Sequence, residues 1–238
     1  YSSNMVIHPV GGVPIVELRR TSLGAWGKIA KRSFDVIIGI LVLIITSPLT
    51  ILSAIIILIE TGWPIIYKNE RVVLRGMLFN TLKFRSMHQN VSTGKQFGKA
   101  GLEAEKKEQE LIKKHNTRKG PIYKIANDPR VTKFGRFMRR WSIDELPQFF
   151  NVIGGSMSIV GPRPHQPREV EKYKDDYPHV FTLKPGITGL AQISGRSDLS
   201  FEEEMKLDIL YIERWNLTLD LIISLKTPFI LLNRRQVG

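Results

Sequence analysis

Two adjacent carboxylates, Asp144 and Glu145, lie close in sequence to several arginines. Arg139 and Arg140 come just before the acidic pair, and Arg163 follows between two prolines. Arginine binds phosphate through paired hydrogen bonds, while a carboxylate can act as a nucleophile or hold a divalent metal ion. Phosphoryl transfer needs both kinds of group, so this cluster is a candidate phosphoryl-transfer site.

The same residues also fit a structural interpretation. Ser142 and Glu145 have the S-x-x-E spacing of a capping box, with acidic residues in the first helical turn, and Gly154-Gly155 suits the far end of that helix. Taken alone, this pattern is more typical of a helix start than of an active site. What the cap leaves unexplained is the gathering of arginines around the carboxylates.

An uncharged run of 24 residues, from 36 to 59, is long enough to reach a membrane-spanning length. At about 1.5 Å per residue, such a helix extends roughly 36 Å, compared with about 30 Å for the hydrocarbon core of a bilayer. A cleaved signal peptide has a shorter apolar stretch at the extreme N-terminus. The sequence therefore predicts a permanent membrane segment.

Two features favour a segment that enters the membrane and returns on the same side. Ser47-Pro48 lies at the middle of the run, where proline removes a backbone donor and bends the helix, and the hydroxyls of Thr46, Ser47 and Thr50 can satisfy freed backbone groups. Positive charge marks the cytoplasmic side, and both flanks carry it. We therefore expect a re-entrant helix over 28–62; a kinked transmembrane helix is the alternative. The flanking cations are Lys28, Lys31, Arg32, Lys68, Arg71 and Arg75.

The overall composition adds an anionic partner to these expectations. The 238 residues include 35 Lys and Arg against 22 Asp and Glu, a net charge of +13. Such a surplus implies nucleic acid, an anionic bilayer surface or a phosphorylated substrate. The absence of cysteine excludes disulfides, thiolate zinc sites and a cysteine nucleophile. With 42% apolar residues, the chain has the composition of an ordinary globular protein.

Around the membrane segment, the sequence predicts a linker over 1–27, which would follow a preceding region, and a catalytic domain over 63–238. Short apolar patterns at 64–67 and 77–84 predict strands. A stretch dense in Glu and Lys, from 102 to 114, predicts a solvated helix.

Two amphipathic helices are also expected. The stretch 133–141 carries Phe134, Phe137, Met138 and Trp141 at helical spacing among basic residues, and 217–232 is mostly aliphatic. Both helices could lie on lipid headgroups, and a soluble core is the alternative partner for the first. The predicted fold class is α+β and mostly helical, with a re-entrant membrane helix and interfacial amphipathic helices.

Five motifs in a fixed order, placed after one apolar segment, closely resemble the bacterial sugar transferases. That family moves a sugar-1-phosphate from a nucleotide sugar to a polyprenyl phosphate. The resemblance covers about residues 31–232, and Ser47-Pro48 matches the Ser-Pro of the family's re-entrant helix. The motifs are Lys83-Phe84-Arg85-Ser86-Met87, Asp128-Pro129-Arg130-Val131-Thr132, Ser142-Ile143-Asp144-Glu145-Leu146-Pro147-Gln148, Gly161-Pro162-Arg163-Pro164 and Lys184-Pro185-Gly186-Ile187-Thr188-Gly189.

The resemblance implies a role for each matching residue. Asp144 would attack the sugar-bearing phosphate of a UDP-sugar and release UMP, after which the lipid phosphate would attack the phosphosugar on the carboxylate. Glu145 would complete the acidic pair, Mg²⁺ would bind beside Asp144, and Arg139 and Arg163 would lie near the phosphates. Further substrate-binding candidates are Lys83, Arg85, Arg130, Thr132 and Asp208.

Several of these candidates have a structural alternative. Asp128-Pro129 is also a turn signal, and Asp208 could be an ordinary aspartate on a helix surface. His165 is given no role. Where the family commonly has Gly-Asp-Met-Ser, this chain has Gly155-Ser156-Met157-Ser158, which leaves open any role of the missing aspartate.

The resemblance also implies partners and a location. The expected partners are a UDP-sugar, a polyprenyl phosphate such as undecaprenyl phosphate, and membrane lipid, with a second copy of the chain left open and nucleic acid not expected. The catalytic domain would face the cytoplasm at the bacterial inner membrane, in the initiating step of surface polysaccharide assembly. The Trp215-Asn216-Leu217 region favours galactose or glucose as the sugar. A membrane-tethered nucleic-acid binder and an inactive scaffold are the rival functions.

Overall fold

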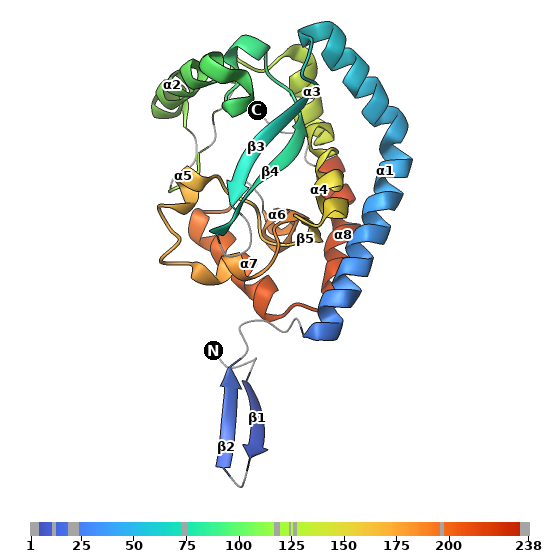
Figure 1. Cartoon of the computed structure of the whole chain (residues 1–238), viewed down its shortest axis with the longest axis vertical. Coiled ribbons are helices and arrows are strands. Elements are labelled where there is room, and N and C mark those ends of the chain that lie inside the picture. The colour runs from blue at the N-terminus through green and yellow to red at the C-terminus, as the bar shows by residue number, and fades with distance from the viewer. Residues whose placement is uncertain are drawn as a thin grey trace.

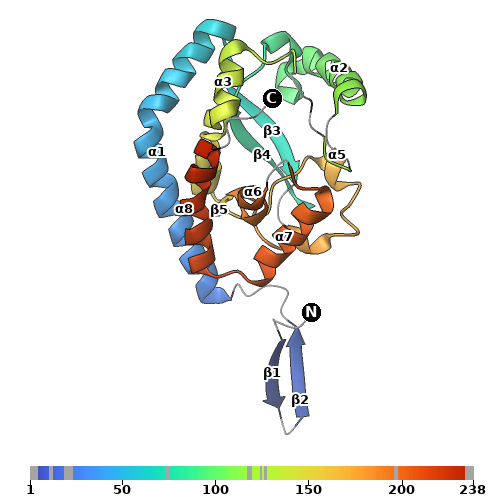
Figure 2. The ribbon, with the colours of Figure 1, turned by 180° about the vertical axis from the view of Figure 1, so that it is seen from behind.

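One long helix, α1 (Ala25–Thr61), runs along one side of the main body, with α2 (Gly98–His115), α5 (Pro167–Val170) and α7 (Phe201–Glu213) on the side away from it (Figures 1 and 2). This arrangement is that of a computed structural model, which describes residues 5–10, 13–18, 24–72, 76–116, 120–123, 125, 128–195 and 198–233. The predicted linker over 1–27 contains an antiparallel hairpin, β1 (Met5–Val10) and β2 (Val13–Leu18).

α1 continues through Pro48 as one bowed helix (Figure 1). Proline has no N–H, so the Ile44 carbonyl one turn earlier loses its usual donor. The Ser47 hydroxyl donates to this carbonyl at 2.8 Å, and the Thr46 and Thr50 hydroxyls each bond the carbonyl four residues back. The predicted hydroxyl compensation is confirmed. The re-entrant path through a membrane stays a prediction.

Most of the apolar side chains of α1 are exposed. By length and composition alone, the helix could cross a membrane, and little of it is buried against the protein. Large exposed apolar surfaces mark membrane or partner contacts. α1 therefore fits a membrane-associated helix rather than the core helix of a soluble domain. Its exposed large side chains are Trp26, Ile29, Ile37, Ile40, Leu41, Ile44, Ile45, Leu49, Ile51, Leu52, Ile55, Leu58 and Ile59.

The N-terminal part of α1 is fixed to the core by charged groups. The buried Lys31 ammonium donates to the Val160 carbonyl at 2.9 Å and forms an ion pair with Asp220 at 2.8 Å. The Arg32 guanidinium donates to two carbonyls at the end of helix α4 (Gln148–Gly154), where cations favour the helix dipole. Two of the cations read as topology signals thus also hold the helix to the domain.

The C-terminal end of α1 is fixed by Arg85. Its Nη2 donates to the Thr61 and Gly62 carbonyls, each at 2.7 Å, and to the Thr61 hydroxyl at 2.8 Å. The last carbonyls of a helix lack partners within the helix, so this guanidinium caps the helix end. Both ends of α1 are therefore attached to the same folded body. Arg75, one of the predicted flanking cations, lies outside the described residues.

Two small sheets organise the rest of the body. Strands β3 (Ile66–Val72) and β4 (Leu78–Phe84) form an antiparallel hairpin, which confirms the two predicted strands. β5 (Ser158–Val160) pairs in parallel with β6 (Gly186–Thr188) in the main core. That core consists of Val152, Met157, Ile159, Val160, Leu183, Tyr211, Ile212, Trp215 and Ile223.

The remaining helices are α2 (Gly98–His115), α3 (Lys133–Trp141), α5 (Pro167–Val170), α6 (Leu190–Ser194), α7 (Phe201–Glu213) and α8 (Leu217–Asn233). The predicted helix at 133–141 is confirmed as α3, and the predicted stretch at 217–232 as α8. The α+β, mostly helical fold class is likewise confirmed.

The amphipathic predictions have mixed outcomes. On α3, Met138 is fully buried, whereas Phe137 and Trp141 are partly exposed, at 48% and 37%, so the helix has both a core side and an open apolar side. α8 lies alongside α1 and exposes Leu221, Ile222, Leu225, Phe229 and Leu232 (Figures 1 and 2). The open apolar faces of both helices fit an interfacial position, which stays a prediction.

The prediction for the Glu- and Lys-rich helix is wrong in one respect. α2 is not solvated all round, because Gly101, Ala104 and Glu108 are buried along one face. The small residues let the helix approach its neighbours, and the buried carboxylate is ion-paired. One face of α2 therefore packs against the domain, and the other face is exposed to solvent.

Candidate active site

A cleft of about 960 Å³ gathers most of the predicted site residues. Its walls come from the β3–β4 hairpin, the buried face of α2, the end of α3 and the segment around residues 163–168. Basic side chains outnumber acidic ones along these walls, which favours an anionic ligand. The predicted residues in the lining are Lys83, Arg85, Arg130, Arg139, Asp144, Glu145 and Arg163.

The acidic pair follows a backbone turn of unusual conformation. Ser142 has φ 55° and ψ 24°, in the left-handed region that L-residues other than glycine rarely adopt. Such a residue costs about 1–3 kcal/mol and persists where surrounding structure holds it. The turn ends α3 and starts a short 3-10 helix, Ile143–Glu145. Arg139 and Asp144 consequently line the same cleft.

The capping-box interpretation of these residues is wrong. Ser142 makes no side-chain capping bond, and the next α-helix begins only at Gln148, after Pro147. Gly155 does end that helix, in a left-handed conformation, as the glycine pair predicts. The S-x-x-E spacing here belongs to a strained turn that places the carboxylates rather than to a helix cap.

The two carboxylates have different environments. Burial raises the pKa of Asp144, an effect that Lys83 and Arg139 oppose and that the neighbouring Glu145 reinforces. Glu145 forms an ion pair with the Lys83 ammonium at 2.7 Å. Among the described residues, Asp144 has no such partner within ion-pair distance. Lys83 therefore neutralises the Glu145 carboxylate, while the Asp144 carboxylate lines the cleft and can contact a ligand there.

Arg139 is positioned by a close contact between α3 and the end of β4. Its Nε donates to the Ser86 hydroxyl at 2.9 Å. Gly135 allows this approach, because a Cβ there would lie 2.1 Å from the Ser86 carbonyl oxygen. Thr132 supports the same contact: its hydroxyl caps α3 by accepting from the Gly135 N–H at 2.8 Å. Thr132 is buried as this cap and does not line the cleft.

Arg130 takes part in a buried ion-pair network. Its guanidinium bonds both carboxylate oxygens of Asp128, with the shortest contact at 2.7 Å, and reaches Glu108 of α2 at 3.4 Å. Glu108 also pairs with Arg168 at 2.7 Å. Sequence reasoning missed Glu108 and Arg168. The available signal was the spacing Gly101, Ala104, Glu108, which places one acid on the narrow face of α2.

Arg163 enters the cleft from a loop supported by Asp208. The Asp208 Oδ2 accepts a hydrogen bond from the Arg163 backbone N–H at 3.3 Å. Asp208 is fully buried on α7, so the alternative of an exposed helix-surface aspartate is wrong. Burial, reinforced by Glu204, raises its pKa well above the usual range. Asp208 lies behind the loop and is not part of the cleft lining.

The serine that replaces the family's usual aspartate lies outside the cleft lining. The Ser156 hydroxyl accepts from the Asn151 side-chain amide at 3.2 Å. Asn151 in turn bonds the Asn80 carbonyl and the Leu82 N–H of β4, each at 2.9 Å. Ser156 therefore helps to hold α4 against the hairpin.

Comparisons of the sequence with known proteins identify the family of this chain. The sequence profile of the family described as "Bacterial sugar transferase" matches residues 26–234. The chain belongs to this family.

Several curated relatives have closely similar sequences. An undecaprenyl-phosphate galactose phosphotransferase of Salmonella typhimurium is 40% identical over 86% of this chain and 40% of its own length. The exopolysaccharide production protein ExoY of Sinorhizobium fredii is 41% identical over 87% of this chain and 88% of its own. A UDP-glucose:undecaprenyl-phosphate glucose-1-phosphate transferase of Escherichia coli is 34% identical over 94% of this chain and 44% of its own length. The chain thus spans less than half the length of two of these bacterial sugar transferases.

Proposed function

We propose that this sugar transferase moves a hexose-1-phosphate from a UDP-sugar to undecaprenyl phosphate and releases UMP. The observation that carries the proposal is the buried Asp144, which has no ion-pair partner among the described residues and lies in a cleft rich in arginine and lysine. Two relatives, 40% and 34% identical to this chain, are named for galactose or glucose-1-phosphate transfer to the same lipid. This reaction would begin the assembly of a surface polysaccharide.

In the proposed mechanism, the Asp144 carboxylate attacks the sugar-bearing phosphorus of the donor. The phosphorus–oxygen bond to UMP breaks, and the phosphosugar is left on Asp144 as an acyl phosphate. An oxygen of the lipid phosphate then attacks the same phosphorus and restores the carboxylate. Two displacements replace one difficult encounter between anions.

The surrounding side chains suit this chemistry. A carboxylate is a weak nucleophile towards an anionic diphosphate, so cations must neutralise the transferring group. Arg139 and Arg163 supply such charge from two sides of the cleft, and among the described residues neither guanidinium forms an ion pair with a carboxylate. Lys83, paired with Glu145, also opposes the rise that burial causes in the pKa of Asp144, and so favours the ionised nucleophile.

The donor set is compatible with Mg²⁺. No group of three His, Cys, Asp or Glu suitable for a metal occurs among the described residues. Magnesium is commonly held by one or two carboxylates together with substrate phosphates and water, so Asp144 and the donor's diphosphate would hold it here. When bound, the ion would neutralise charge on the transferring phosphate.

The central test is Asp144→Asn, with Asp175→Asn, an exposed residue outside the cleft, as the matched control. UMP release would be measured with UDP-galactose and UDP-glucose in the presence of undecaprenyl phosphate and Mg²⁺. We expect the Asp144 variant to lose turnover while remaining folded, and the control to retain it. Radiolabelled donor should leave label on Asp144 in the native enzyme when the acceptor is omitted. Unchanged turnover of the Asp144 variant would refute the mechanism.

We further propose that α1 is re-entrant and that the catalytic domain faces the cytoplasm. Attachment of both ends of α1 to one body supports this path, since a helix crossing the membrane would place its ends on opposite sides. The chain has no cysteine, so a single introduced cysteine is a unique label. Cysteines at Lys28 and Lys68 should both be shielded from an impermeant thiol reagent in intact cells. Labelling of only one of them would contradict the re-entrant path.

A further inference from the structure

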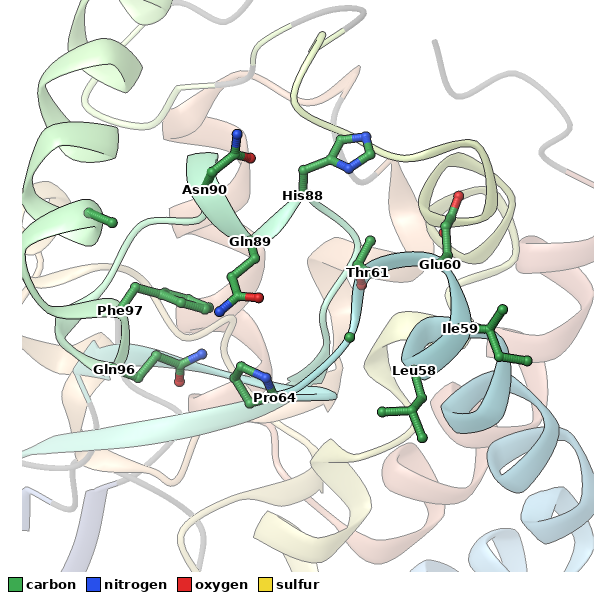
Figure 3. Close-up of a pocket in the computed structure, with 12 residues that line it drawn as sticks. Leu58, Ile59, Glu60, Thr61, Pro64, His88, Gln89, Asn90, Gln96 and Phe97 are labelled. Carbon is green, nitrogen blue, oxygen red and sulfur yellow. The ribbon is translucent and has the colours of Figure 1, made fainter.

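A second cavity, of about 800 Å³, opens at the C-terminal end of α1 (Figure 3). Its residues come from segments far apart in the sequence. Leu58 and Ile59 belong to the last turns of α1, and Gln89 and Asn90 to a short 3-10 helix after β4. Phe97 ends a second 3-10 helix, just before α2. None of these residues has a role in the proposed chemistry of the cleft.

The walls of this cavity differ in polarity. Leu58 and Ile59 present aliphatic side chains at its mouth, with 47% and 81% of their surfaces exposed, and Phe97 adds an aromatic ring. Across from the α1 side chains lie hydrogen-bonding groups, namely His88, Gln89, Asn90 and Gln96, with the Phe97 ring beside Gln89 and Gln96 (Figure 3). On the α1 side, the Glu60 carboxylate also lines the cavity. A ligand matched to these walls would have an apolar part and a polar head.

The cavity adjoins the catalytic cleft. The Gln96 side chain lines both spaces. Arg85, which lines the cleft, donates to the Thr61 and Gly62 carbonyls, and these two residues line the second cavity. The Nε and Nη1 of this buried guanidinium have no hydrogen-bond partner among the described residues. A cation with unused donors thus stands between the two spaces.

The mouth of the cavity lies where a membrane boundary is expected. Trp63, just beyond the end of α1, is 70% exposed. Tryptophan is enriched at membrane–water interfaces, the level at which lipid phosphates also lie. A lipid in the bilayer could therefore reach the mouth without leaving the headgroup level, whereas a water-soluble nucleotide sugar would gain nothing from the aliphatic entrance.

We propose that this cavity admits the lipid acceptor of the transfer reaction, an inference that rests on the proposed function. The first isoprenyl units would pack against Leu58, Ile59 and Phe97, and the phosphate would pass Gln96 towards Arg85 and the catalytic cleft. A volume of about 800 Å³ falls within the roughly 300–1,000 Å³ typical of small-ligand sites. Only the head end of a long polyprenyl chain fits, and the rest of the chain stays in the bilayer.

The first test fills the cavity from α2. Ala100 lines it and is exposed, so Ala100→Trp adds bulk without altering α1. Leu102→Trp is the matched control, because Leu102 is exposed on the same helix and lines neither space. Ala100→Trp should raise the KM for undecaprenyl phosphate about tenfold or more, with the KM for the UDP-sugar unchanged. Leu102→Trp should change neither value.

Two kinetic outcomes would overturn the assignment. One is an unchanged acceptor KM in the Ala100→Trp enzyme, or an equal rise in both tryptophan variants. The other is a parallel rise of donor and acceptor KM, which would place the donor in this space. Exchange of labelled UMP into UDP-sugar without acceptor should continue at the native rate in Ala100→Trp. Failure of the native enzyme to show this exchange would refute the covalent mechanism, and the acceptor KM comparison would still decide the cavity.

A second test does not depend on turnover. A polyprenyl phosphate carrying a diazirine on its first isoprenyl unit would be photolysed with the native chain in lipid nanodiscs, and the labelled peptides mapped. Label within residues 58–64 or 88–97, reduced in Ala100→Trp, is the expected result. Label confined to the exposed middle of α1, or unaffected by Ala100→Trp, would show that the lipid does not enter the cavity.

Discussion

Replacing Lys31 by methionine should strongly destabilise the protein. The Lys31 ammonium is buried and pairs with Asp220 at 2.8 Å, and the change would leave the fully buried Asp220 without its cation. Removing one partner of a buried ion pair costs about 3–5 kcal/mol. Asp220 keeps hydrogen bonds from the Tyr211 hydroxyl at 2.7 Å and the Trp215 Nε1 at 3.1 Å, which places the expected loss near the lower end of that range.

For a chain of this length, each kcal/mol shifts the melting temperature by about 2–4 °C, so a loss near 3 kcal/mol corresponds to about 6–12 °C. Thermal unfolding in detergent would be followed by tryptophan fluorescence, because Trp215 contacts Asp220 directly. Lys28→Met is the matched control: Lys28 is exposed one turn earlier on α1, and its loss should cost under about 0.5 kcal/mol. Equal melting temperatures for the two variants would refute the structural role assigned to Lys31.

Three further predictions follow from single contacts. Arg85→Met should lower the free energy of unfolding by about 1.5–3 kcal/mol, because it removes charge-assisted bonds to the end of α1, and thermal melting checks this. Gly135→Ala should cost about 1–3 kcal/mol and reduce turnover, since the new methyl group would force α3 away from Ser86; a native melting temperature would contradict it. Burial raises the pKa of Asp208, so the stability this group contributes is present at acidic pH and is lost as pH rises through its folded-state pKa. Asp208→Asn should therefore melt at a higher temperature than the native chain at alkaline pH, and the difference should vanish near the unfolded pKa of 3.8.

Local patterns in the sequence predicted the elements whose signals are local. The run at 36–59 became part of α1, and the strands β3 and β4 and the helix α3 appeared where apolar spacing placed them. The hydroxyl beside Pro48 compensates the freed carbonyl because both groups lie within one helical turn. These features depend on neighbours in the chain, which the sequence displays directly.

Contacts between distant segments could not be predicted in the same way. Lys31 pairs with Asp220, which lies 189 positions later in the chain. Arg130 pairs with Glu108, which belongs to a helix that the sequence predicts to be solvated. The Ser142 turn was misread because S-x-x-E is a common capping pattern, whereas a left-handed serine has no distinctive sequence signal. The family motifs predicted most of the residues that line the cleft. They did not distinguish a residue that lines the cleft, such as Arg139, from one that lies behind it, such as Asp208.

The net charge of +13 comes in part from arginines that hold the fold together and in part from arginines that line the cleft. Arg32, Arg85 and Arg130 bond carbonyls or carboxylates and hold the body together. Arg139 and Arg163 line the cleft without a carboxylate partner among the described residues. A binder of nucleic-acid backbones would need such free cations along an open surface. Here they converge on one buried carboxylate, Asp144, an arrangement that serves a phosphate group entering the cleft rather than a polymer lying across it.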